Sequence, residues 1–121
     1  MHEASMTIQL IEYIVSEASK RNAKAVSEVY IEIGELTHLN PEQISFLYYS
    51  LTRNNSLLKN SKLHIKTIEG IAECTNCNYR GKIPKIEDLF LLVTFKCPKC
   101  GSKLKIIRGN EFIVKRIKMI I

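Results

Sequence analysis

Four cysteines stand in two matched pairs whose spacing suits a single metal ion. The pairs are Cys74 with Cys77 and Cys97 with Cys100, and nineteen residues separate them. A gap of two residues lets one tight turn direct both sulfurs to the same point. Two such turns supply the four thiolates of a tetrahedral site. The spacing therefore predicts a Zn(II) site made of these four cysteines.

The residues beside the cysteines favour tight turns. Pro98 stiffens the second turn, and Gly101 permits the left-handed backbone that such turns often need. Asn78 follows the first pair, and asparagine tolerates that backbone better than most residues. Because four thiolates leave no open position for water, we expect a structural site and not a catalytic one. Four buried free thiols or a dithiol redox pair explain the matched spacing less well.

The N-terminus carries a second, smaller set of metal ligands. Met1 and His2 supply the α-amine, a backbone nitrogen and an imidazole, and the backbone nitrogen of Glu3 completes a plane. Four nitrogens in a plane suit Ni(II) or Cu(II). Judged on these residues alone, an early histidine is more often part of a frayed, solvated chain end.

Length and composition indicate one small globular chain. The 121 residues amount to about one domain, with enough apolar content for a modest core. No apolar run approaches the ~20 residues of a membrane-spanning helix. The first residues do not read as a signal peptide, so we expect a cytoplasmic protein. Thiols stay reduced there, which favours metal binding over disulfides.

The formal net charge of +6 is unevenly distributed along the chain. Residues 1–70 carry seven basic and eight acidic side chains, whereas residues 71–121 carry eleven and four. A basic second half would suit a nucleic acid, an acidic protein partner, or compensation for the anionic thiolates.

Hydrophobic periodicity predicts two helices and three strands. Helices are expected over residues 4–21 and from Pro41 onward, and strands over 26–36, 62–69 and 111–120. Asn40 is expected to cap the second helix, with Gln43 as its capping-box partner. In the last strand the apolar residues change parity, which a bulge near Lys115 and Arg116 would explain. The apolar faces expected for the helices are Ile8, Ile11, Val15 and Ala18 widened by Leu10 and Ile14, and Ile44, Leu47, Tyr48 and Leu51.

The order of elements predicts an α+β fold. Two strands alone are marginal, so we expect the last strand to return and complete a three-stranded sheet covered by two helices. The cysteine region then becomes an inserted, zinc-ribbon-like module. The expected domains are residues 1–70 together with 108–121, and residues 71–107.

The ordered motifs resemble the HypA family of nickel-incorporation proteins for [NiFe]-hydrogenase and, in some bacteria, urease. Besides Met1-His2-Glu3 with Ser5 and the two cysteine pairs, the resemblance is carried by Ile31-Glu32-Ile33-Gly34-Glu35-Leu36, Leu39-x-Pro41 and Gly109-x-Glu111. Each motif is short, but the ordered combination is specific and covers the whole chain.

The resemblance implies a nickel metallochaperone and not an enzyme. His2 would be the essential nickel ligand, beside the Met1 amine and the backbone nitrogens of His2 and Glu3. The cysteines would hold structural Zn(II), and nickel would be transient cargo. The implied partners are a HypB-type GTPase, whose contact residue Glu3 resembles, and the [NiFe]-hydrogenase large subunit.

The rival interpretation is a zinc-ribbon module that binds nucleic acid or has a regulatory role. It is favoured by the cysteine pairs and the basic second half, but the basic residues are not interleaved with aromatic residues as a stacking surface would require. His38 and His64 are expected to be solvated or turn residues. The sequence leaves open the oligomeric state, including a homo-oligomer, and the choice between hydrogenase and urease.

Overall fold

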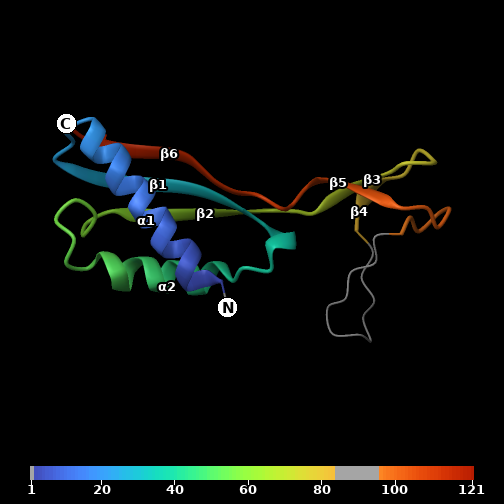
Figure 1. Ribbon diagram of the computed structural model, residues 1–121, viewed down its shortest axis with the longest axis horizontal. Helices are drawn as coiled ribbons and strands as arrows, with labels where there is room; N and C mark the ends of the chain where they lie inside the picture. The colour runs from blue at the N-terminus through green and yellow to red at the C-terminus, as the bar shows by residue number, and fades with distance from the viewer. Residues whose placement is uncertain (1, 84–95) are drawn as a thin grey trace.

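The computed structural model describes residues 2–83 and 96–121 and contains two small sheets that follow one another along its long axis (Figure 1). The first sheet has the strand order β2-β1-β6 and the second has the order β4-β3-β5. The predicted α+β class is confirmed. The elements are α1 (Glu3–Lys20), β1 (Ala25–Gly34), a short 3-10 helix (Glu35–Thr37), α2 (Pro41–Thr52), β2 (Lys62–Ile68), β3 (Ile71–Cys74), β4 (Arg80–Lys82), β5 (Leu104–Arg108) and β6 (Phe112–Ile120).

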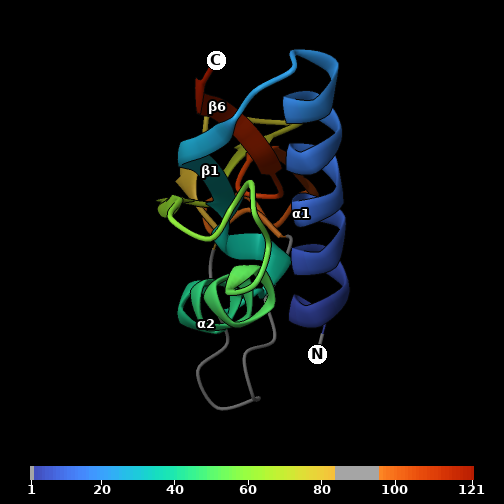
Figure 2. The same cartoon turned by 90° about the vertical axis from the view of Figure 1, so that its left-hand side faces the viewer.

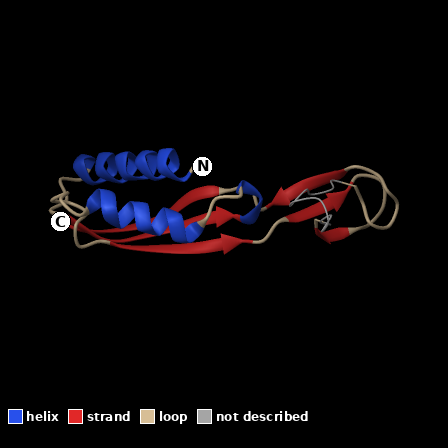
Figure 3. Cartoon of the chain, turned by 90° about the horizontal axis from the view of Figure 1, so that it is seen from below, coloured by secondary structure: helices blue, strands red, loops and turns tan. Residues whose placement is uncertain are grey.

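The first sheet is built around β1. This strand pairs in parallel with β2 and antiparallel with β6, so the last strand does return to the first sheet. Both helices lie on the same face of the sheet (Figure 3). Figure 2 shows α1 along its length and α2 nearly end-on, so the two helices cross. None of the helices in the described ranges is long and apolar enough to span a membrane.

The helix faces that enter the core differ in part from the predicted ones. Ile8 and Leu51 were expected in the core, but they are 47% and 49% exposed. Thr7 and Thr52 are buried instead. Each threonine hydroxyl donates to the carbonyl one turn earlier, at 2.6 Å and 2.8 Å, so burial leaves no polar group unsatisfied. A pattern that counts threonine as polar therefore misplaces the buried stripe.

A bulge in β6 occurs where the sequence predicted one. Tyr30 pairs with Arg116, whereas its neighbour Ile31 pairs with Val114, so Lys115 is the extra residue. The bulge restores the parity of the strand, so that apolar residues on both sides of it pack on one core. These residues are Phe112, Val114, Ile117 and Met119. A second irregularity, between Val26 and Glu28 on β1, was not predicted.

The two sheets meet where glycine backbones touch. A Cβ on Gly34 would lie 2.0 Å from the Gly109 carbonyl oxygen, and a Cβ on Gly109 would lie 2.4 Å from the Gly70 Cα. Gly109 has φ +115°, which side chains with a Cβ rarely adopt. The N–H of Leu36 donates to the Gly109 carbonyl at 2.7 Å, and the Leu36 side chain packs against the core of the second sheet. The domain limits stated above stay a prediction.

Candidate metal centre

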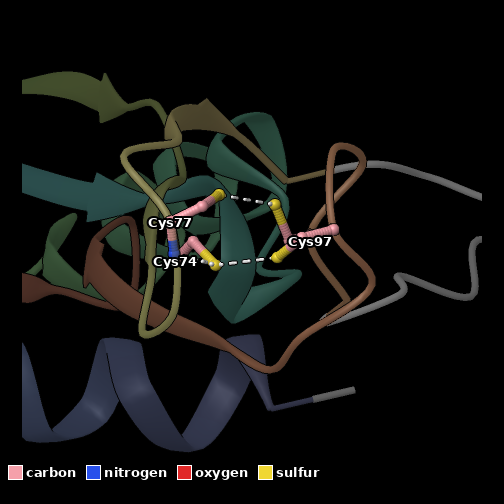
Figure 4. Close-up of side chains that lie close together, drawn as sticks. Cys74, Cys77 and Cys97 are labelled. Atoms are coloured by element: carbon pink, nitrogen blue, oxygen red, sulfur yellow. Dashed lines mark hydrogen bonds between the residues drawn. The ribbon is translucent and has the colours of Figure 1, made fainter.

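The strand pairing of the second sheet brings the two cysteine pairs together. Cys74 is the last residue of β3, and its partner across the ladder is Leu104, the first residue of β5. Cys77 therefore follows β3, while Cys97 and Cys100 precede β5 at the same end of the sheet. The sulfurs of the two turns face one another (Figure 4).

The four sulfurs have the separations that a tetrahedral metal site requires. The Cys74 and Cys100 Sγ atoms are 3.4 Å apart, and the Cys77 and Cys97 Sγ atoms are 3.6 Å apart. All four Sγ atoms lie within 4.8 Å of one another. Zn–S bonds of about 2.3 Å in a tetrahedron place sulfurs about 3.8 Å apart. The set of donors thus fits a zinc ion.

Backbone N–H groups of the two turns point at the sulfurs. Asn76 and Cys77 each donate to the Cys74 Sγ at 3.3 Å, and Lys99 donates to the Cys97 Sγ at 3.4 Å. Such bonds favour the charged thiolate over the thiol. Gly101 has φ +77°, the left-handed conformation expected for it.

The matching expectation for Asn78 is wrong. In the part of the chain that the structure describes, the positive φ angles of non-glycine residues belong to Asn22 and His38. The N–H of Cys74 instead donates to the Tyr79 carbonyl at 2.9 Å, so the first turn closes without a left-handed residue at position 78.

The close packing of the four cysteines shifts the pKa values of their thiols in opposite directions. The hydroxyl and backbone of Ser102 and the thiol of Cys74 hold the pKa of Cys100 down to about 6. A hydrogen bond with the Tyr79 backbone favours the Cys77 thiolate, yet burial and the three neighbouring thiols outweigh it and raise the Cys77 pKa to about 12. Like charges this close oppose one another, and a divalent cation removes that opposition.

The site is closed on the side of the protein core. Cys74 and Cys97 are buried with Ala72, Ile83 and Leu104, while Cys100 is exposed. A metal ion held by these four sulfurs would stabilise the second sheet. Its coordination would be complete, with no position open for a substrate or water.

His2, unlike the partly buried cysteine cluster, lies on the surface at the start of α1. It is exposed and occupies the N-cap position, and its side chain makes no capping hydrogen bond. Its carbonyl accepts the N–H of Met6 at 3.0 Å and the hydroxyl of Ser5 at 3.1 Å. The imidazole is therefore presented to solvent from an ordered helix end. Met1, the other predicted ligand residue, lies outside the described residues.

Glu3, the first residue of α1, is buried. Its side chain is 8% exposed, and its carboxylate accepts the backbone N–H of Asn40 at 3.0 Å. The chain's terminal ammonium group, the Asn40 N–H and its own backbone N–H lower the Glu3 pKa to about 2. The carboxylate is thus held as an anion between the N-termini of α1 and α2.

The Glu3 contact replaces part of the predicted capping box. The Asn40 side chain does cap α2, accepting the N–H groups of Glu42 at 2.9 Å and Gln43 at 3.2 Å. The reciprocal bond was expected from Gln43, but the Asn40 N–H donates to Glu3 instead. The two residues are far apart in sequence, so no local pattern could have indicated the pair.

The other two histidines differ in their surroundings. His38 is exposed in the left-handed region with φ 59°, as expected for a turn residue. His64 is exposed but has partners, since its Nε2 lies 2.9 Å from Glu28 Oε1 and its ring stacks on Tyr30 with centroids 4.4 Å apart. The Arg116 guanidinium lies 4.7 Å from the Tyr30 centroid. Sequence reasoning missed this grouping of basic and aromatic side chains, because strand pairing creates it.

Comparison with known proteins bears on both sites. The family model described as "Hydrogenase/urease nickel incorporation, metallochaperone, hypA" matches residues 1–119. The hydrogenase maturation factor HypA of Methanocella arvoryzae is 37% identical, over 98% of each chain. The protein of the same name from Caldanaerobacter subterraneus is 35% identical, over 98% of this chain and 99% of that one.

A solved structure agrees with these sequence matches. The solution structure of the Ni metallochaperone HypA from Helicobacter pylori matches with a TM-score of 0.67 and 26% identity, covering 99% of this chain and 98% of that one. The chain therefore belongs to the HypA family of nickel-incorporation metallochaperones.

Proposed function

We propose that this chain binds Ni(II) at its N-terminus and delivers it for the maturation of a [NiFe]-hydrogenase. The proposal is supported by the names of the relatives, which describe hydrogenase maturation factors, and by the name of the Helicobacter pylori protein, which describes a Ni metallochaperone. It places the cargo on His2 and the neighbouring nitrogens of Met1 and Glu3.

The observation that carries the proposal is the presentation of His2. The imidazole is solvent-exposed at the N-cap of α1, and the Glu3 carboxylate ties that helix end to Asn40. The first N–H groups of an α-helix have no carbonyl partner within the helix. Backbone nitrogens at this position can therefore serve nickel without breaking a helical hydrogen bond. A site on the surface also lets nickel leave without opening the core.

The four cysteines are proposed to hold Zn(II) as a structural ion. Zinc there would neutralise part of the thiolate charge and join the turns that follow β3 and precede β5. The residues proposed as zinc ligands are Cys74, Cys77, Cys97 and Cys100.

We further propose a HypB-type GTPase and the [NiFe]-hydrogenase large subunit as partners in the cytoplasm. The Glu3 carboxylate is buried and bonded to Asn40, so we infer that in the free protein it positions the N-terminus. A direct contact between this carboxylate and a GTPase would require that bond to open first.

Nickel titration of histidine variants tests the binding site. His2→Ala in zinc-loaded, untagged protein should abolish tight nickel binding while zinc content stays unchanged. His38→Ala and His64→Ala are matched controls, since both side chains are exposed, and they should bind nickel like the parent protein. Equal nickel binding by all three variants would show that His2 is not a nickel ligand.

Transfer of the metal tests the delivery step. Nickel-loaded parent protein should pass nickel to the metal-free precursor of a hydrogenase large subunit, and His2→Ala should pass none above the free-ion control. If His2→Ala supports the same transfer as the parent protein, delivery does not depend on the proposed site.

A further inference from the structure

Strand β6 forms one edge of the first sheet and leaves a row of backbone groups without a strand partner. Within residues 2–83 and 96–121, β6 pairs only with β1. The Glu111 carbonyl accepts the Gly34 N–H at 2.8 Å, and the Ile120 carbonyl accepts the Lys24 N–H at 2.7 Å, so these residues face β1. The N–H and C=O groups of successive residues point alternately to the two sides of an antiparallel strand. The groups facing the outer edge are therefore those of Phe112, Val114, Ile117 and Met119.

A groove lies beside this edge, between α1 and β6, and it is apolar near Met6 and more polar near Glu17 and Arg21. It consists of two adjoining hollows of about 390 Å³ and 330 Å³ that share Tyr13 and Val114. Met6 and Leu10 line it from α1. From β6 it is lined by Phe112, Ile117 and Met119, and at the bulge also by Lys115 and Arg116. The groove is thus continuous with the outer edge of β6.

The opposite face of β6 is basic. Arg116 lies opposite Tyr30 of β1, and Lys118 lies opposite Glu28, whose carboxylate its ammonium contacts at 3.2 Å. Lys115 stands at the bulge and lines hollows on both faces of the sheet. Residues 112–121 contain these three cations and no acidic residue. Glu17 on α1 is the acidic residue that lines the groove, and its carboxylate is occupied by Lys20 and Arg21 at 3.2 Å each.

The charge of the β6 side chains determines which kind of strand could pair with the outer edge of β6. If two copies of this chain paired through β6, lysines and arginines would face one another across the ladder, which is unfavourable. Basic residues on an edge strand are a known device against such self-pairing. An acidic strand meets the opposite condition, because its carboxylates would lie beside Lys115 and Arg116, whereas the Lys118 ammonium is already paired with Glu28.

We propose that the outer edge of β6, together with the groove between β6 and α1, binds an extended acidic segment of another protein as an added β-strand. The side chains of a strand alternate between two faces. Apolar residues of the segment would enter the groove, and aspartate or glutamate residues between them would meet the basic face. Backbone hydrogen bonds to β6 would supply affinity that does not depend on sequence. This site is separate from nickel binding and does not rest on it.

Peptide binding to the full-length, zinc-loaded protein tests the proposal. The probe is a dye-labelled peptide of about eight residues that alternates glutamate with valine, a length typical of strands. Its binding should raise fluorescence anisotropy and slow amide exchange in β6. A peptide that alternates lysine with valine should bind at least tenfold more weakly.

Backbone methylation of the peptide separates strand addition from simple charge attraction. Two versions of the acidic peptide carry N-methyl groups on alternate residues, one version for each edge of the strand. The version methylated on the edge that faces β6 should lose binding, and the other should retain it. Lys115→Glu should weaken binding several-fold, whereas Lys59→Glu, an exposed control outside this surface, should leave it unchanged.

Several outcomes would overturn the proposal. These are no binding of the acidic peptide, equal binding of both methylated versions, or protection of β2 in place of β6. Concentration-dependent dimerisation through β6 would assign the edge to a second copy of the chain. Competition by single-stranded RNA at equal or lower concentration would assign the basic face to nucleic acid. Because none of these measurements involves nickel, their failure is distinguishable from failure of the nickel site.

Discussion

The carboxylate of Glu3 accepts the backbone N–H of Asn40 at 3.0 Å and thereby joins the N-termini of α1 and α2. The two helices otherwise begin on different segments of chain, and each end carries N–H groups that need acceptors. The buried carboxylate of Glu3 lies at the N-termini of both helices. His2, the residue on which the proposed function depends, directly precedes this anchor.

Removal of the Glu3 carboxylate should loosen the proposed nickel site without removing a proposed nickel ligand. In Glu3→Ala the backbone nitrogen is kept, but the carboxylate that holds the first turn of α1 is lost. We expect faster amide exchange at Asn40 and Met6 and a several-fold loss of nickel affinity. Glu12→Ala, an exposed site on the same helix, is the control and should change neither. Unchanged exchange at Asn40 in Glu3→Ala would contradict the anchoring role.

Loss of the proposed zinc ion should affect the second sheet before the first. Cys74→Ala removes one of the four sulfurs, and we expect loss of the bound zinc together with the amide protection of β3 and β5. Protection in β1 and β2 should persist, because their core contains no cysteine. Metal analysis and hydrogen exchange on the same sample measure both effects. Retained zinc would exclude the four-sulfur site, and global unfolding would contradict the predicted division into domains.

The glycine contact between the sheets should be sensitive to a single methyl group. Gly109→Ala would place a Cβ 2.4 Å from the Gly70 Cα at a backbone angle that suits glycine. We expect the free energy of unfolding to fall by roughly 2–4 kcal/mol. Gly101→Ala is the matched control, because Gly101 also has positive φ but has no atom within 4 Å of an added Cβ. The free energy of unfolding should fall by only about 1 kcal/mol in Gly101→Ala. Equal losses in urea titrations would show that crowding at the junction is unimportant.

Much of the fold could be predicted, because its signals are local. The alternation of Val29, Ile31 and Ile33 predicts the central strand, and all three are buried. The parity change near Lys115 predicts the bulge that the β1–β6 register contains. The spacing of the cysteines likewise predicts their clustering, because each pair lies in one turn.

What could not be predicted depends on contacts between distant segments. The parallel pairing of β1 with β2, the bond from Asn40 to Glu3 and the contact between Gly70 and Gly109 join residues that no periodicity connects. Burial of Thr7 and Thr52 was also missed, because it depends on back-bonding to the preceding turn. The same reason applies to the edge of β6, whose basic residues and adjoining groove come together only after the strand has returned to the sheet.

Nickel is proposed to be held by the free N-terminus, and a one-residue extension tests this most directly. Addition of one glycine before Met1 keeps every side chain but moves the α-amine away from His2 and leaves an amide in its place. Nickel affinity should be measured by isothermal titration for the native and extended proteins, both loaded with zinc. We predict tight binding by the native terminus and a loss of at least about a hundredfold on extension, since the set of nitrogens is no longer complete. Equal affinity of the two proteins would contradict a nickel site at the free N-terminus.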